Sequence, residues 1–290
     1  MRKYIAFLSL TVIVLLLFSS CTKEVHEDVY EDLVIDDNQP PPFDGVSTVE
    51  LNTYVNKLYV DLIGRSPSEA ELDQATQQLR DGEFTTAAKE AVITPLIESK
   101  AYYDRFFEVT TQKLLQGADS FQIAQEATNL YFAVDLVLSQ GDTLIGYTLQ
   151  LELDKLVALL DVKAEYRNGD ITVNEFMRRM IMNQFYDQIN MGSLNYVVSC
   201  FENLFHRQPT EQETAAGVDM VNGGSNQLFL VDGNDKGDFS NIVTTTLEFY
   251  EGLVVDTYIN LLARPPLSEE MSTSAIELSD TRDLPALYLE

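Results

Sequence analysis

The chain of 290 residues has no tryptophan, two cysteines and two histidines, and its 19 lysines and arginines stand against 46 aspartates and glutamates. The formal charge of −27 argues against nucleic acid and anionic membrane surfaces as partners, because both are themselves negative. The sequence also lacks a G-x-S-x-G motif, a Gly-rich phosphate loop and a CxxCH haem-attachment motif. We therefore expect a non-enzymatic protein without an organic cofactor.

One long apolar run is present, at residues 4–20, and two basic residues precede it. Its length falls short of the roughly 20 apolar residues of a stable membrane helix, so it predicts an export signal. Two serines followed by Cys21 resemble a bacterial lipobox, in which the cysteine is lipidated and becomes the first mature residue. An ordinary signal peptide or an anchor helix is the alternative. We expect residues 1–20 to be a lipoprotein signal peptide.

Residues 21–48 are acidic and contain three consecutive prolines, which predicts an extended tether attached to the membrane only through the lipid. His26 lies in it and is expected to be solvated. Thr22 does not match the enterobacterial signal for inner-membrane retention, which favours the outer membrane and leaves periplasmic and surface exposure open. With Cys21 lipidated, Cys200 has no disulfide partner and is expected to be a small buried residue.

From about Glu50 onward, apolar residues recur three and four positions apart, and long two-residue alternation is scarce. This spacing is typical of amphipathic helices. About 240 residues are enough to bury a sizeable core in one or two domains. The sequence predicts an all-α fold.

Three segments align without gaps, at residues 59–72, 201–214 and 258–271. An aromatic residue opens each copy. The identical positions are Leu62, Leu204 and Leu261; Arg65, Arg207 and Arg264; Pro67, Pro209 and Pro266; and Glu71, Glu213 and Glu270.

The repeated pattern predicts a turn between two helices. Gly64 suits a helix C-terminus that needs a positive φ, and the proline cannot continue the first helix. The S/T-x-x-E sequence of the first two copies is a capping box, whereas Leu267 of the third copy predicts a weaker cap. The shared arginine can bond helix carbonyls or pair with the shared glutamate. A catalytic Arg–Glu pair is the alternative, but three copies favour architecture.

His206 aligns with Gly64 and Ala263. A position that accepts three such different residues does not require imidazole chemistry. We predict that His206→Ala leaves the function intact.

A second motif recurs as LRDGEFT at residues 79–85 and YRNGDIT at residues 166–172. Arg65 to Gly82 spans 17 positions and Gly169 to Arg207 spans 38, a sum of 55 that compares with 57 from Arg207 to Arg264. The spacing predicts helix–turn–helix units of about 55 residues. We expect a first unit at 49–117, intervening helices at 118–165, and a second and partial third unit at 166–290.

Residues 166–213 resemble the phycobilisome linker domain and related bacterial repeats of unknown function, in which an RNGxITxxEFxRxxxxSxxY segment precedes an FxxLLGRxPxxxE segment. A weaker match covers Leu51–Phe107, which also resembles a helical domain of unknown function found with planctomycete-type cytochromes. The resemblance implies an all-α bundle used in protein–protein assembly. Light harvesting is not expected to transfer, because this chain is acidic and has an export signal, and His206 stands where that family usually has glycine.

A candidate calcium loop lies at residues 232–241, where four oxygen-bearing side chains surround two glycines: Asp232, Asn234, Asp235 and Asp238. It departs from the EF-hand pattern, since Lys236 occupies a ligand position and Val243 replaces the bidentate glutamate. An inserted acidic loop is the alternative.

Together these features predict a lipid-anchored helical scaffold or adaptor of the cell envelope, with an unknown protein partner. A surface lipoprotein that binds an extracellular ligand, with or without calcium, is the alternative, and a hydrolase is a third class with less support.

Overall fold

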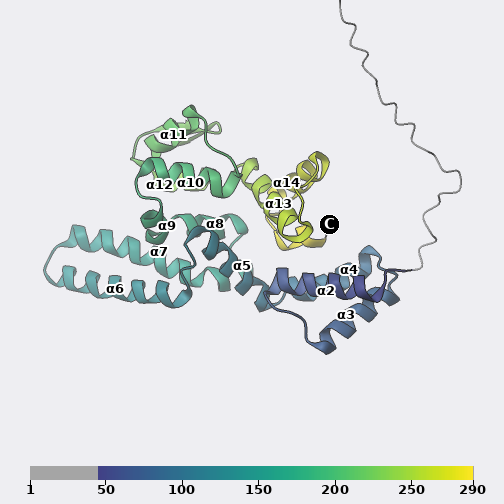
Figure 1. The fold of residues 1–290 in the computed structure, drawn as a ribbon. Helices are drawn as coiled ribbons and strands as arrows, with labels where there is room; N and C mark the ends of the chain where they lie inside the picture. The colour runs from purple at the N-terminus through teal and green to yellow at the C-terminus, as the bar shows by residue number, and fades with distance from the viewer. Residues whose placement is uncertain (1–44, 290) are drawn as a thin grey trace, which may run out of the picture. The chain divides into compact units, whose positions relative to one another are not determined.

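The computed structural model describes residues 45–289 (Figure 1). The expected signal peptide, Cys21 and all of the tether up to residue 44 lie outside the described residues. The described part is all-α, as the sequence predicts, with one short antiparallel hairpin and a final 3-10 turn. Its elements are α2 (Thr48–Ile63), α3 (Glu69–Asp81), α4 (Thr86–Ile97), α5 (Lys100–Leu114), α6 (Ser120–Ser139), α7 (Thr143–Asn168), α8 (Val173–Ile181), α9 (Gln184–Ile189), α10 (Ser193–Phe205), α11 (Glu211–Val221), β1 (Asn226–Leu228), β2 (Val231–Gly233), α12 (Lys236–Val243), α13 (Leu247–Leu262), α14 (Ser268–Thr281) and η1 (Pro285–Leu289).

Polar side chains mark the beginnings of the helices. Ser47 caps α2 and forms a capping box with Glu50, and Asp119 caps α6 in the same way with Gln122. Such boxes satisfy two N–H groups that a helix N-terminus otherwise leaves free. The starts of these helices are therefore fixed by local sequence.

The buried side chains form two hydrophobic clusters. The first joins α2, α3, α4 and the start of α5, and includes the fully buried Val55 and Leu79. The second extends from Phe107 to Leu287 and contains most of the larger aromatic residues. The last turn, η1, packs against α4, so the end of the chain contacts the first cluster.

A short helix followed by an aromatic pair occurs three times along the chain. The pairs are residues 102–103 on α5 after α4, residues 185–186 on α9 after α8, and residues 249–250 on α13 after α12. One tyrosine of each pair is almost completely buried: Tyr102, Tyr186 and Tyr250. The first two pairs follow the repeated motif at residues 79–85 and 166–172. The third continues directly into the helix that ends at the third repeated turn.

The region between the first and second units forms an arm, which we define as α6 and α7 (residues 120–168). The two helices pair along their length as an antiparallel hairpin, and their connecting turn extends away from the other helices (Figure 1). Gly141 in that turn has φ of +85°, a conformation that favours glycine. The arm lies where the sequence analysis places intervening helices, at residues 118–165, and α7 continues to Asn168. None of the helices in residues 45–289 is long and apolar enough to cross a bilayer.

Candidate functional site

The three repeated turns share one backbone path. Each first helix, α2, α10 or α13, ends in a left-handed residue: Gly64 with φ of +74°, His206 with +56° and Ala263 with +53°. The positive φ predicted from Gly64 is therefore a property of all three turns. His206 and Ala263 adopt it although their Cβ atoms make it unfavourable.

The shared arginine and glutamate form a two-pronged ion pair in each copy. The Nη1 and Nη2 atoms of the arginine donate to the two carboxylate oxygens at 2.8 and 2.6 Å for Arg65–Glu71, 2.8 and 2.7 Å for Arg207–Glu213, and 2.8 and 2.7 Å for Arg264–Glu270. Nη1 also donates to the next residue's carbonyl, which lies between two helices. The pair therefore ties the end of one helix to the beginning of the next.

The same glutamate caps the second helix, since its Oε2 accepts the backbone N–H of the N-cap residue at 2.7 Å in every copy. Ser68 and Thr210 complete the box by accepting the glutamate's own N–H, whereas the Leu267 side chain has no acceptor. The weaker third cap is confirmed.

These contacts also change the acidity of the three glutamates. The hydrogen bonds from the arginine, followed by those from the cap residue, lower the pKa of Glu71, Glu213 and Glu270 to about 2. At neutral pH each is a firmly ionised structural carboxylate. A general acid or base would need a pKa nearer to neutrality.

The aromatic residue that opens each copy lies under the arginine. The guanidinium carbon is 5.4 Å from the ring centre of Tyr59, 5.1 Å from that of Phe201 and 5.3 Å from that of Tyr258 for the three successive copies. This distance allows a cation–π contact. The shared arginine, the shared glutamate and the aromatic residue that opens each copy thus all contribute to the turn itself.

The second turn has further contacts. Arg207 makes two additional bonds of 2.7 Å to Glu248, from Nε and Nη2. The Nε2 atom of His206 lies 3.3 Å from the Gly252 carbonyl oxygen and 3.3 Å from Asp256 Oδ1. His206 therefore contacts α13, and its position is explained by packing at a turn.

Cys200 is fully buried on α10, as expected, and its sulfur accepts a weak hydrogen bond from Tyr186. Burial raises the pKa of the thiol to about 12. A thiol with that pKa is protonated at neutral pH and is a poor nucleophile.

The side chains suggested for calcium serve a helix cap in this structure. Asp235 is the N-cap of α12 and accepts the N–H of Asp238, whose own carboxylate accepts the N–H of Asn234. Asp232 lies on β2 and accepts from Gln227 across the hairpin. Within residues 45–289, no three His, Cys, Asp or Glu side chains are grouped closely enough to hold a metal ion. The geometry matches the inserted acidic loop better than a calcium cage.

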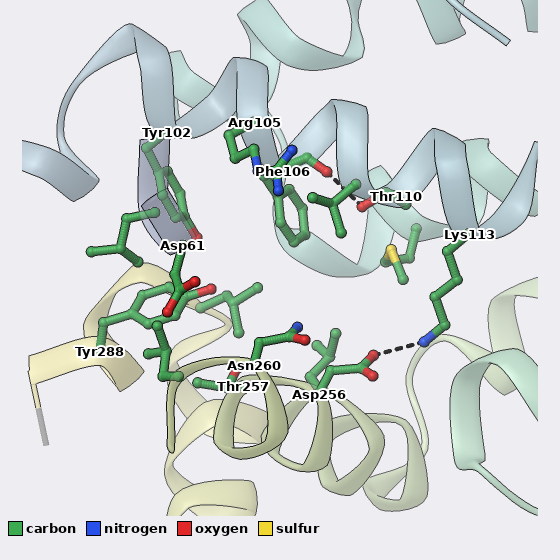
Figure 2. Close-up of a pocket in the computed structure, with 16 residues that line it drawn as sticks. Asp61, Tyr102, Arg105, Phe106, Thr110, Lys113, Asp256, Thr257, Asn260 and Tyr288 are labelled. Carbon is green, nitrogen blue, oxygen red and sulfur yellow. Dashed lines mark hydrogen bonds and ion pairs between the residues drawn. The ribbon is translucent and has the colours of Figure 1, made fainter. Parts of the chain in front are cut away.

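A cleft of about 330 Å³ lies between α2, α5, α13 and η1. Figure 2 shows polar groups directed toward it from several elements, among them Asp61, Tyr102, Arg105, Asn260 and Asp256. Apolar side chains such as Leu62 and Met177 complete its walls. No single stretch of sequence contains these residues, so the sequence motifs did not reveal the cleft.

The charged groups of the cleft are paired with one another or with close neighbours. Lys113 bonds Asp256 at 2.8 Å, Asp61 pairs with Lys57 at 2.7 Å, and Arg105 pairs with Glu108 at 3.0 Å. Burial alone would raise the pKa of Asp256, but His206 and Lys113 outweigh it and hold that pKa below its usual value.

The two tyrosines of the cleft are also unreactive. Burial, more than any neighbouring group, raises the pKa of Tyr102 and that of Tyr288. Their hydroxyls stay protonated at neutral pH and can form hydrogen bonds. The cleft therefore suits binding better than proton transfer.

The most exposed apolar surface belongs to the arm. We call residues 131–151, where α6 ends and α7 begins, the arm tip. These 21 positions hold eight of the 23 exposed large hydrophobic side chains found in residues 45–289: Tyr131, Phe132, Leu136, Leu138, Leu144, Ile145, Tyr147 and Leu151. An exposed apolar surface of this density typically marks an interaction site.

Comparison with known proteins adds no relative: no family model matches the chain, and searches of curated proteins and of solved structures find no match.

Proposed function

We propose that this chain is a non-enzymatic, lipid-anchored adaptor of the bacterial cell envelope that assembles with another protein through its arm. The arm tip carries the proposal, because two paired helices leave large apolar side chains in water on a surface that the other helices of residues 45–289 do not cover. Each of the three turns locks two helices outside the arm with a two-pronged ion pair, which suits a scaffold of fixed shape.

Two further observations support an adaptor. The repeated motifs resemble those of phycobilisome linker domains, whose role is assembly. The cysteine and histidine residues of the described part, which often act in catalysis, have structural positions here: Cys200 is buried and protonated, and His206 forms part of a turn. The apolar run before Cys21 and the acidic tether support attachment by lipid to the outer membrane.

The test has two arms, both in cells. Replacing Cys21 with serine should release the protein from the membrane fraction, because the lipid would be its only attachment. A photo-crosslinking amino acid placed at Phe132 should give one dominant protein adduct, whereas the same group at Val49, an exposed position on α2, should not. Absence of an adduct at Phe132, or equal adducts at both positions, would contradict the proposed adaptor function.

A second candidate function, the binding of a small extracellular ligand, is favoured by the cleft. Its volume lies at the lower end of the range for small-molecule sites, and it combines apolar walls with a few polar groups. A thermal-shift screen of small metabolites would test it, with Arg105→Gln as the matched variant. A ligand that raises the melting temperature of the unchanged protein and of the Arg105→Gln variant equally would not be bound in this cleft.

A further inference from the structure

The chemistry of the arm tip is specific enough to select a class of partner. The proposed adaptor function, on which this inference rests, calls only for a protein partner. We propose that the arm tip binds a cationic amphipathic helix of that partner. The argument uses the spacing of the exposed side chains, the charge of the arm and the alternatives that this charge disfavours.

The first observation is a row of apolar side chains along α7. Leu144, Tyr147 and Leu151 are three and four positions apart, so they lie on one face of the helix. Leu144 is 76% exposed and Tyr147 is 64% exposed. The side chains that α7 buries are a different set, which includes Leu153 and Leu156. The exposed row is therefore not used to pack α7 within the hairpin.

The second observation is that α6 has an exposed apolar set of its own. Phe132 and Leu136 are four positions apart and share a face, while the residues that this helix buries are Ile123, Ala127 and Val134. An amphipathic helix binds an apolar surface through its own residues at i, i+3 or i+4, and i+7, and rows of the same spacing on the arm can pack against such a helix. The α7 row covers about 10 Å of axis, so a partner helix of two to three turns would cover it.

The third observation concerns charge. Residues 114–154, which include the whole arm tip, form the longest stretch of the chain without a lysine or arginine, and they contain six acidic residues. Two of these, Asp135 and Asp142, lie within the tip itself. A partner that places leucines against the rows and lysines beside these carboxylates would match both the apolar and the acidic character of the surface.

Charge also disfavours other occupants. A second copy that docks tip to tip would bring its own Asp135 and Asp142 and no lysine or arginine to the interface, which costs free energy at each close approach. Insertion of the tip into a lipid bilayer would remove Asp135 and Asp142 from water without a basic partner. A cationic helix places positive charge beside both carboxylates, including Asp142, which caps α7 by accepting the N–H of Ile145, and it buries the rows.

A binding experiment can test the proposal with defined probes. The protein is the chain from Thr22, which retains every described helix and both hydrophobic clusters. The first probe is a fluorescent 18-residue peptide of leucine and lysine arranged as an amphipathic helix. The second has the same composition scrambled so that no apolar face forms. Fluorescence anisotropy at 0.15 M salt should show at least roughly tenfold tighter binding of the first peptide, equivalent to about 1.4 kcal/mol.

Matched variants locate the binding surface. Leu144→Gln with Tyr147→Gln should weaken binding of the amphipathic peptide roughly tenfold or more, since two anchors of the row are lost. Val49→Gln with Ile276→Gln removes two exposed hydrophobic side chains, 74% and 54% exposed, from α2 and α14 and should leave binding unchanged. Circular dichroism of each variant checks that the helices are intact.

Several results would overturn the inference. Equal binding of both peptides would mean attraction by net charge alone, and equal weakening by both double variants would mean that the arm is not the site. A dimer in sedimentation equilibrium that the Leu144→Gln/Tyr147→Gln variant dissociates would make a second copy the occupant. Binding to neutral phosphatidylcholine vesicles that the same variant abolishes would make a lipid bilayer the occupant of the arm tip.

The outcome is separable from that of the crosslinking test. Arm-dependent peptide binding without an adduct at Phe132 in cells would refute the adaptor function and leave the surface chemistry standing. An adduct at Phe132 without selective peptide binding would support an adaptor whose partner has different chemistry, which would refute this inference alone.

Discussion

The second and third turns have the same motif and backbone path but different surroundings. In the second, the guanidinium of Arg207 uses all five N–H groups, with two bonds to Glu213, two to Glu248 and one to a carbonyl. In the third, Arg264 makes three bonds, all within the turn. The third turn also lacks a side-chain cap at Leu267.

The difference shows which part of the turn is local and which is tertiary. The arginine–glutamate pair, the ring below it and the left-handed residue occur in both copies, so the motif by itself produces them. Glu248 and the atoms that His206 contacts belong to α13. This helix packs against α10, the helix that ends at the second turn. We therefore expect the second turn to tolerate change less well than the third.

The largest effect is expected at Gly252, where α13 crosses the second turn. A Cβ at this position would lie 1.9 Å from the Leu204 carbonyl oxygen, which is backbone and cannot rotate away. Gly252→Ala should destabilise the fold by about 3 kcal/mol or more, at the upper end of the cost of overpacking, because the two helices must separate. Urea denaturation monitored by circular dichroism measures the loss.

Gly146→Ala is the matched control for this substitution. Its Cβ would also meet a close atom, at 2.3 Å, but that atom is a terminal methyl of the exposed Leu138 side chain. The leucine can move, and alanine is favoured over glycine in a helix interior by about 1 kcal/mol. We expect neutral or increased stability. Equal losses in the two variants would show that the crossing at the second turn is not special.

The next effect separates the two arginines. Arg207→Met should lower the free energy of unfolding by about 2 kcal/mol, because Glu213 and Glu248 lose their shared partner and face each other partly buried. Arg264→Met should cause a smaller loss, since Arg264 pairs with one glutamate whereas Arg207 pairs with two. The measurement is the urea midpoint of both variants at pH 7. Equal losses of the free energy of unfolding in the two variants would show that Glu248 adds no measurable stability to the second turn.

Lowering the pH should reduce the stability contributed by the second and third turns to a similar extent. The pKa values of Glu213 and Glu270 are both lowered from 4.5 to about 2, so the folded state binds protons less readily than the unfolded state. Their contribution is fully present above about pH 5 and is lost as the pH falls toward 2. Glu213→Gln and Glu270→Gln should each flatten the decline of stability between pH 5 and 2 by a similar amount. A flattening confined to Glu213→Gln would mean that the local turn does not hold Glu270.

The repeated turns could be predicted from the sequence because they depend on neighbouring residues. The capping boxes at Ser68 and Thr210, and the weak cap at Leu267, follow from residues three apart. The left-handed conformation of His206 and Ala263 was missed, because a positive φ is uncommon for residues other than glycine. Alignment with Gly64 was the signal that could have found it.

The cleft was missed because it depends on distant segments. Asp61 and Asp256 are far apart in sequence and line one cleft only when α2 and α13 pack. The arm was expected only as additional helices, since periodicity identifies a helix but does not show that its outer face lacks a partner.

The smallest expected effect would make the third turn more like the second. Leu267→Ser supplies an oxygen that can accept the N–H of Glu270, as Ser68 and Thr210 do for their glutamates. A new cap of this kind stabilises a helix by about 0.5–1 kcal/mol, which should raise the urea midpoint. Leu267→Ala is the control, because it removes the same exposed leucine without adding an acceptor. If the serine and alanine variants give the same urea midpoint, the missing cap is not what distinguishes the third turn. The remaining difference from the second turn would then be the absence of a counterpart to Glu248.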